Sequence, residues 1–263
     1  MLVRQLVAPN PSLMTGPGTN TWLIGRDRVA VVDPGPAMAR HIDAIIEAAG
    51  APIRWILATH THPDHSPGTA LLRERTGAEV LGMSAPGGEH QDTSFVPDRV
   101  MADGDTLATA EFSLAAVHTP GHASNHLCFL LEGSREILTG DHVIDGSTVV
   151  INPPDGDMQA YIESLRKLRE LRPVALLPGH GSRIEDPLRV IDGIIEHRLQ
   201  REAGVFAAVC AHPGLGSHAL VAIVYAHVPE RLHRWAQRSL LAHLLKLEAE
   251  ERVRRDGEDW FPA

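Results

Sequence analysis

The chain has 263 residues, 43% of them hydrophobic and 22% charged, with a formal net charge of −9 at pH 7. This length and composition indicate a globular protein with a substantial core. No run of about 18 apolar residues marks a membrane span, and the start MLVRQLVAPNPSLM lacks the apolar core and cleavage site of a signal peptide. We therefore expect a cytoplasmic protein that does not bind a membrane.

The negative charge is unevenly distributed along the chain. From Pro187 onward ten Lys and Arg residues offset ten Asp and Glu residues, so the net charge of −9 belongs to residues 1–186. Bound divalent cations would offset part of that acidity. The totals show no broad basic face for nucleic acid. Cys128 and Cys210 both lie in apolar surroundings, which predicts two buried thiols rather than a disulfide.

Short runs rich in Val, Ile and Leu alternate with amphipathic stretches along residues 1–186. The segment APNPSLMTGPGTN is a predicted loop between two early strands, and it lacks the Lys-Ser/Thr ending of a phosphate-binding loop. Helical spacing predicts helices over residues 37–49, 67–76 and 158–171, with Ser66 as N-cap of the second. The alternation predicts an α/β sandwich. The predicted strands lie in TWLIG, RVAVVDPG, IRWILAT, FSLAAVHTPG, HLCFLLEG, EILTG and VALLPG.

The pattern changes near residue 187. From there the sequence predicts helices only, until Asp256-Gly257 near the end of the chain predicts the turn of a small hairpin. We therefore predict a first domain over residues 1–186 and a second over residues 187–263.

The segment THTHPDH, residues 59–65, carries three imidazoles and a carboxylate directly after a predicted strand. Nitrogen and oxygen donors of this kind suit divalent transition metals. Because side chains alternate in extended chain, His60 and His62 point the same way and can converge on one ion. Asp64 and His65 lie in the loop before the next helix and are aimed at a neighbouring point. The segment therefore predicts two adjacent half-sites.

Three more ligand-type residues follow other predicted strands. TPGH ends in His122, TGD ends in Asp141 and PGH ends in His180. Strand ends of this kind meet at one edge of an α/β sheet. Four separate strand ends that carry metal-binding side chains predict a metal centre far more specifically than any one motif does.

The motifs HTHPDH, TPGH, TGD and PGHG, in this order, resemble the metallo-β-lactamase fold superfamily, whose αββα sandwich holds a dinuclear metal site. GTNTWLIG, TGDHVIDGSTVVINPPDGDM and LLAHLLKLEAEERV resemble its β-lactamase-like endoribonuclease and hydrolase branch, which has a C-terminal winged-helix domain. The resemblance implies two zinc ions per chain. One would be held by His60, His62 and His122, the other by Asp64, His65 and His180, with Asp141 bridging both.

This resemblance implies a hydrolase whose nucleophile is a hydroxide shared by two zinc ions. Asp64 is either a ligand alone or a ligand that also orients the hydroxide and exchanges a proton. Single-stranded RNA is the first expected substrate. The alternative substrate is an ester or thioester, as in hydroxyacylglutathione hydrolase. The alternative function is that of a winged-helix nucleic-acid binder with a structural metal site. The oligomeric state stays open.

Five further residues have open roles. Asp33 either orients a ligand imidazole or caps a turn, and Asn20 faces substrate or is an ordinary loop residue. We expect His118, His126 and His142 to be packing or supporting histidines rather than ligands.

Overall fold

The computed structural model describes residues 2–88 and 90–263. The chain divides into two compact units. The first unit comprises Met1–Thr119, Asn125–Val149 and Leu168–Leu188, and the second comprises Pro120–Ser124, Val150–Lys167 and Arg189–Ala263. The loop that contains His122 thus belongs to the second unit, and the domain division predicted at residue 187 stays a prediction.

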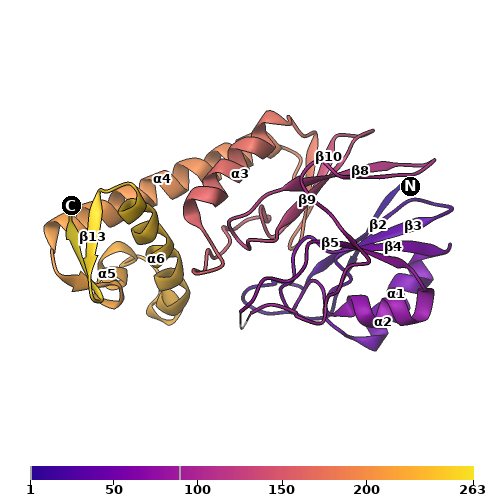
Figure 1. Ribbon diagram of the computed structural model, residues 1–263, viewed down its shortest axis with the longest axis horizontal. Helices are drawn as coiled ribbons and strands as arrows, with labels where there is room; N and C mark the ends of the chain where they lie inside the picture. Colours follow the sequence, from indigo (N-terminus) through magenta and orange to yellow (C-terminus); the bar gives the residue numbers. More distant parts are fainter. Residues whose placement is uncertain (1, 89) are drawn as a thin grey trace. The chain divides into compact units, whose positions relative to one another are not determined.

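Two sheets form the first unit (Figure 1). The six-stranded sheet has the order β1-β2-β3-β4-β5-β6 and the five-stranded sheet has the order β11-β10-β9-β8-β7. The strands of the first sheet are β1 (Val3–Val7), β2 (Asn20–Ile24), β3 (Val29–Val32), β4 (Ile53–Leu57), β5 (Glu79–Gly82) and β6 (Arg99–Val100). Those of the second sheet are β7 (Thr106–Ala108), β8 (Ser113–His118), β9 (Leu127–Leu131), β10 (Glu136–Gly140) and β11 (Ala175–Pro178).

Alternating side chains of the first sheet enter two different cores, as the two-residue period of a strand requires. Trp22 and Val32 join residues of the second sheet such as Phe129 in the core between the sheets. Leu23 and Val31 lie on the other face and pack with α1 (Ala39–Ala49) and α2 (Gly68–Thr76). The predicted α/β sandwich is confirmed in this unit.

All seven strands and all three helices predicted for residues 1–186 are present, the third being α3 (Met158–Glu170). Helix α2 begins at Gly68, and the predicted cap at its start is wrong. The Ser66 hydroxyl donates to Asp92 Oδ2 at 2.7 Å instead of capping the helix. The cysteine prediction is half right, because Cys128 is buried whereas Cys210 is exposed.

The second unit contains the C-terminal helices and a small sheet. Its helices from residue 187 onward are α4 (Pro187–Ala211), α5 (Ser217–Val224), the 3₁₀ turn η1 (Glu230–Leu232) and α6 (His233–Ala249). The sheet has the order β12-β14-β13, from β12 (Leu215–Gly216), β14 (Asp259–Pro262) and β13 (Val253–Asp256). The expectation of helices alone before the hairpin is wrong at β12, whose two residues are too short for a strand pattern.

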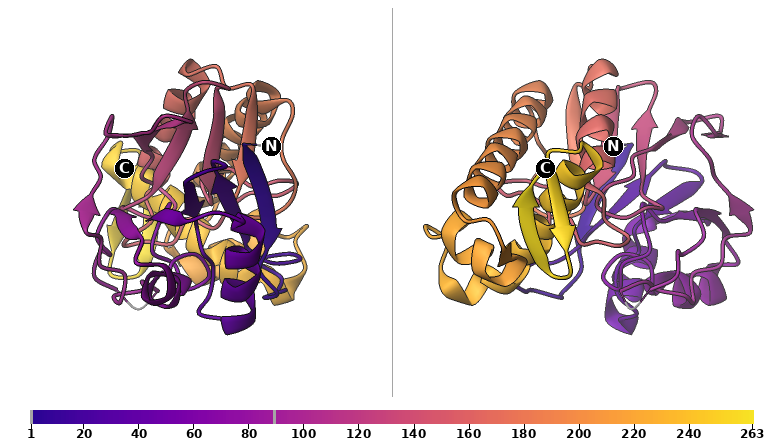
Figure 2. Two further views of the ribbon diagram at one scale, coloured as in Figure 1. Left: turned by 90° about the vertical axis from the view of Figure 1, so that its right-hand side faces the viewer. Right: turned by 60° about the vertical axis from the view of Figure 1, so that its left-hand side comes forward.

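The predicted hairpin is confirmed. Asp256 pairs with Asp259, so Gly257 and Glu258 form a two-residue loop between β13 and β14, the yellow hairpin in the right panel of Figure 2. Trp260 of β14 packs with Leu240, Leu244 and other residues of α4, α5 and α6. Three helices and a small antiparallel sheet around this core form the winged-helix arrangement that the resemblance implied. Among the helices of the described residues, none is both long enough and apolar enough to span a bilayer.

Candidate metal centre

Parallel strand pairs bring the candidate ligands of the first unit to one edge. In the pair β10 and β11, Gly140 lies opposite Pro178, so Asp141 and His180 leave the second sheet together. In the pair β3 and β4, Val32 lies opposite Leu57, so the loops that begin at Asp33 and Ala58 leave the first sheet together. The carboxyl ends of parallel strands therefore place these side chains side by side, as the sequence predicted.

Gly179 lets the two loops approach closely. A Cβ at this position would lie 2.7 Å from Asp141 Oδ1 and 2.7 Å from His65 Cε1. Both distances are shorter than a nonbonded carbon contact allows. The glycine of the PGH motif is therefore required for Asp141 and His65 to meet, and it is more than a turn residue.

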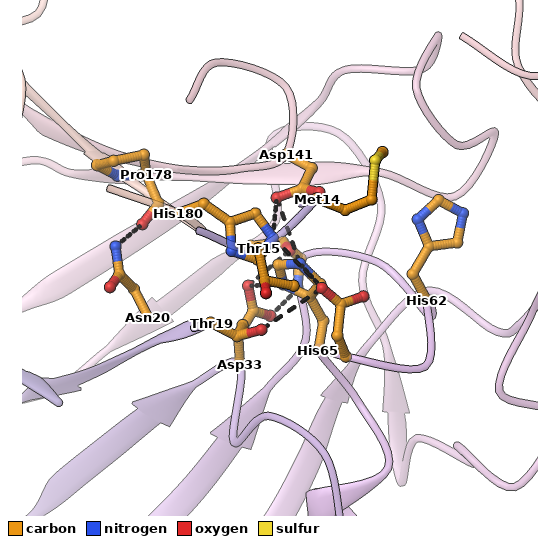
Figure 3. A network of polar contacts seen from close by, with 12 residues as sticks. Met14, Thr15, Thr19, Asn20, Asp33, His62, His65, Asp141, Pro178 and His180 are labelled. Carbon is orange, nitrogen blue, oxygen red and sulfur yellow. Dashed lines mark hydrogen bonds and ion pairs between the residues drawn. The ribbon is translucent and has the colours of Figure 1, made fainter. Parts of the chain in front are cut away.

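Two imidazoles and two carboxylates converge at this edge (Figure 3). His65 Nε2 lies 3.3 Å from Asp141 Oδ1 and 3.6 Å from Asp64 Oδ2. His180 Nε2 lies 3.2 Å from the same Asp141 oxygen and 3.3 Å from the same Asp64 oxygen. The backbone places both rings so that one nitrogen of each faces both carboxylates.

The electrostatics of this group favour bound positive charge. Burial opposes the charged form of His180, but the Asp141 carboxylate outweighs it and raises the pKa of His180 to about 10. Burial would raise the pKa of Asp141, yet the charges of His180 and His65 hold it well below its usual range. The two carboxylates therefore stay ionised and require cations, which protons or a metal can supply.

His60 and His62 lie beside this group. His60 Nε2 is 2.9 Å from His62 Nδ1, and ligand atoms of His60, His65 and Asp141 all lie within 4.8 Å of one another. Asp64, His65 and His180 form a second such group. Two overlapping sets of donors thus share His65.

The other ring nitrogen, Nδ1, of His65 and of His180 also has a partner, and this contact fixes the orientation of each ring. His65 Nδ1 lies 3.0 Å from Asp33 Oδ2, and His180 Nδ1 lies 3.1 Å from Gly18 O. An acceptor at Nδ1 keeps a ring hydrogen there, so a metal that displaces the proton from Nε2 can bind its lone pair. Asp33 therefore orients the imidazole of a candidate ligand. It also accepts from the backbone N–H of Thr59 at 2.7 Å, which joins the loops after β3 and β4, so this contact does not cap a turn.

Sequence reasoning missed Thr59 and left Asn20 open. The Thr59 hydroxyl donates to Asp33 Oδ2 at 2.8 Å and lies 3.0 Å from His60 Nδ1, so it links two parts of the centre. Its position directly before His60 was the signal available. The Asn20 carboxamide is 1% exposed and donates to Pro178 O and Gly181 O, both at 2.9 Å. Asn20 therefore supports the loop that carries His180 and does not face solvent.

The other histidines are placed as follows. His122 belongs to the second unit, where its Nδ1 lies 2.9 Å from Val150 O. His126 is fully buried, and its ring is stacked on His60 with centroids 5.0 Å apart. His142 is also fully buried, and its ring centroid lies 5.7 Å from that of His126. His118 is the last residue of β8 and is half-buried.

The residues of the first unit fit a metal. His65 Nε2 is buried and forms no hydrogen bond, although two carboxylates face it. A buried nitrogen of this kind costs free energy unless a partner satisfies it. A divalent cation would satisfy it, and imidazole nitrogens with carboxylate oxygens are the donors that zinc and similar metals take.

Comparison with known proteins agrees with this geometry. Residues 14–180 match the metallo-beta-lactamase superfamily, and residues 217–260 match the beta-lactamase associated winged helix domain. The chain is 31% identical over 267 residues to the Beta-lactamase-like protein 2 homolog of Drosophila melanogaster, with 96% of this chain and 89% of that protein covered. It is 32% identical over 211 residues to the atrochrysone carboxyl ACP thioesterase of Aspergillus fumigatus, with 79% and 64% covered.

The fold also matches solved structures. A metallo-beta-lactamase family protein from Thermus thermophilus superposes with a TM-score of 0.83 at 22% identity, covering 100% of this chain and 99% of that one. The two matched families, the two-sheet fold and the His/Asp donor groups lead to one conclusion. The chain belongs to the metallo-beta-lactamase superfamily, and it is a metal-dependent hydrolase with a C-terminal winged-helix domain.

Proposed function

We propose that this protein hydrolyses thioester substrates at a dinuclear zinc centre. The observation that carries the proposal is the convergence of His65 and His180 on the carboxylates of Asp64 and Asp141, at distances of 3.2 to 3.6 Å. Two imidazoles and two carboxylates in this arrangement provide negative charge and nitrogen and oxygen ligand atoms that a metal ion can bind.

The ligand assignment takes one set from the donor groups described above and the other from the resemblance. Asp64, His65 and His180 would hold one zinc ion, and His60, His62 and His122 would hold the other. Asp141 would face both ions, in keeping with its place near His65, His180 and the His60 group. When bound, two zinc ions would supply Lewis-acid polarisation of the acyl group and a nucleophile derived from water at neutral pH.

Asp64 would accept the proton from the attacking water and return it to the leaving group. Its side chain is 30% exposed, whereas those of His65 and His180 are 0% and 7% exposed, so it is the one of these three groups that can exchange a proton with substrate and solvent. Hydrolysis forms a bond from the water oxygen to the carbonyl carbon and breaks the carbon–sulfur bond. The water proton passes to Asp64 and then to the departing thiolate.

A relative named as an acyl carrier protein thioesterase supports the thioester substrate. A thioester also suits the acidic residues 1–186, because the neutral acyl–sulfur bond needs no basic surface to attract it.

Single-stranded RNA remains the second candidate on one observation. Arg234 and Arg238 lie four residues apart on α6, Arg231 precedes them in η1, and all three are at least partly exposed. A small basic strip of this kind can contact phosphates. The C-terminal half of α6 is occupied with packing, because Leu240, Leu244 and Leu247 are fully buried.

The test is metal analysis of protein purified without chelator, followed by three assays on the same sample: an acyl thioester, a single-stranded RNA and a generic phosphodiester. We expect two zinc ions per chain and fast thioester hydrolysis. Cleavage of RNA with no thioesterase activity would transfer the proposal to the second candidate. One metal at saturation would exclude the dinuclear centre.

A further inference from the structure

The loop Pro120–Ser124 is attached to α3 and to the segment that precedes it. Gly121 O accepts from the backbone N–H of Asp157 at 2.8 Å. The Ser164 hydroxyl donates to Pro120 O at 2.9 Å, and the Ser124 hydroxyl donates to Asp155 Oδ1 at 2.5 Å. Within the second unit, these bonds hold the loop on both sides of His122.

Gly121 lies directly against the backbone of α3. Its φ is +138°, and a Cβ would lie 2.3 Å from Tyr161 Cα. The loop can adopt this path only with glycine at this position. Any displacement of Tyr161 therefore moves the residue next to His122.

A backbone carbonyl sets the ring of His122. Its Nδ1 lies 2.9 Å from Val150 O. A carbonyl oxygen can only accept, so Nδ1 carries the hydrogen and Nε2 is left with a lone pair. The orientation of the ring therefore depends on the position of the peptide between Val150 and Ile151.

Two C-terminal helices contact the two groups that support His122, namely the Val150–Ile151 peptide and Tyr161. The hydroxyl of Ser239 on α6 accepts from the backbone N–H of Ile151 at 3.4 Å, and this contact is buried. The N–H of Ile151 and the carbonyl of Val150 belong to the same peptide group. The guanidinium of Arg198 on α4 lies 5.3 Å from the ring centroid of Tyr161, with Arg198 3% exposed and Tyr161 fully buried.

We propose that Ser239 and Arg198 are positioning residues for His122, so that the C-terminal helices fix the orientation of a candidate zinc ligand in their own unit. This inference rests on the proposed function, in which His122 is a zinc ligand. It gives the winged-helix domain a role in the metal chemistry that requires no nucleic acid. Ser239 acts on the His122 ring through the Val150 peptide, and Arg198 acts on the His122 backbone through Tyr161 and Gly121.

The test is titration with zinc alone against a chromophoric chelator, which resolves two binding steps per chain. Substitutions in the surroundings of a metal-binding histidine typically cost about 10-fold to 100-fold in affinity. We therefore expect Ser239→Ala to weaken one step by about 10-fold and to leave the other within about twofold. Arg198→Lys, which keeps the charge but loses the flat guanidinium over Tyr161, should weaken the same step.

Ser217→Ala is the matched control. It removes a hydroxyl from α5 in the same unit, where the contact partner is Gln237 rather than Ile151, and it should leave both steps unchanged. The decisive comparison repeats Ser239→Ala in a His122→Ala background. If Ser239 acts through His122, the second substitution should change zinc affinity no further.

An equal loss of affinity in both backgrounds would overturn the inference, and so would unchanged zinc binding in the Ser239→Ala chain. A different result marks failure of the proposed function. If His122→Ala binds zinc as tightly and in the same amount as the natural chain, His122 is not a ligand. Ser239 and Arg198 then have no zinc ligand to position.

Discussion

Replacement of Asp33 by asparagine separates orientation of a metal ligand from simple stability. Asp33 is 1% exposed, and its carboxylate accepts from Thr59 N, Thr59 Oγ1 and His65 Nδ1. Asparagine has the same shape but exchanges one acceptor oxygen for an NH₂ group. If the amide nitrogen takes the place of Oδ2, the Thr59 hydroxyl and His65 Nδ1, which both donate to Oδ2, would face another donor.

The His65 ring can respond to this change by moving its hydrogen. Nδ1 would accept from the introduced amide, and the ring hydrogen would move to Nε2, which removes the lone pair needed for a metal. We expect zinc affinity to fall by about 10-fold to 100-fold. Loss of one charged hydrogen bond in a buried position should lower the free energy of unfolding by about 1 to 3 kcal/mol.

Two measurements on the same preparations check this reasoning: zinc titration against a competing chelator, and urea unfolding of the metal-free protein. Asp27→Asn is the matched control, because Asp27 is exposed in the same unit and its substitution should change stability by no more than about 0.5 kcal/mol. Zinc affinity of Asp33→Asn within about threefold of the natural chain would refute the tautomer argument.

Three other substitutions test the shared carboxylate, the support of the His180 loop and the pH dependence. Asp141→Asn removes the charge that faces both His65 and His180, so bound metal should fall below two ions per chain and turnover should fall steeply, as metal analysis and a thioester assay would record. Asn20→Ala deletes two buried hydrogen bonds to the His180 loop, and it should cost about 2 to 4 kcal/mol in urea unfolding, with little change expected only if water replaces the amide. Burial lowers the pKa of His243, so the folded protein should lose stability as the pH falls below about 6.5, the ordinary histidine pKa; His243→Leu should show a smaller loss between about pH 7.5 and 5.5.

The fold was largely predictable because its signals are local and strong. The buried strands are short segments rich in Val, Ile and Leu, and α1 and α3 carry regular apolar spacing. The strands β5, β6 and β7 have only four, two and three residues. Such short strands are defined by pairing with the next strand, and the few residues of each carry too little pattern to mark it.

The candidate ligands were also predictable, since imidazole and carboxylate side chains at strand ends are visible in the sequence. Their supports were harder to find. Asp33 was visible as a carboxylate at a strand end, but two opposite roles fitted it equally until its contacts with His65 and Thr59 were known. Asn20 sits in a glycine-rich region that suggests solvent exposure, whereas strand β2 carries it into the protein interior.

Backbone groups limit sequence-based prediction most severely. His122 and His180 are each oriented by a main-chain carbonyl, from Val150 and Gly18 respectively. Every residue has such a carbonyl, so side-chain identity at Val150 and Gly18 says nothing about the contact. What matters is the path of the backbone, and residues such as Ser239 and Asn20 fix that path through one or two hydrogen bonds. A substitution in this protein can therefore weaken metal binding without touching a ligand, and its effect depends on which peptide group the lost side chain held.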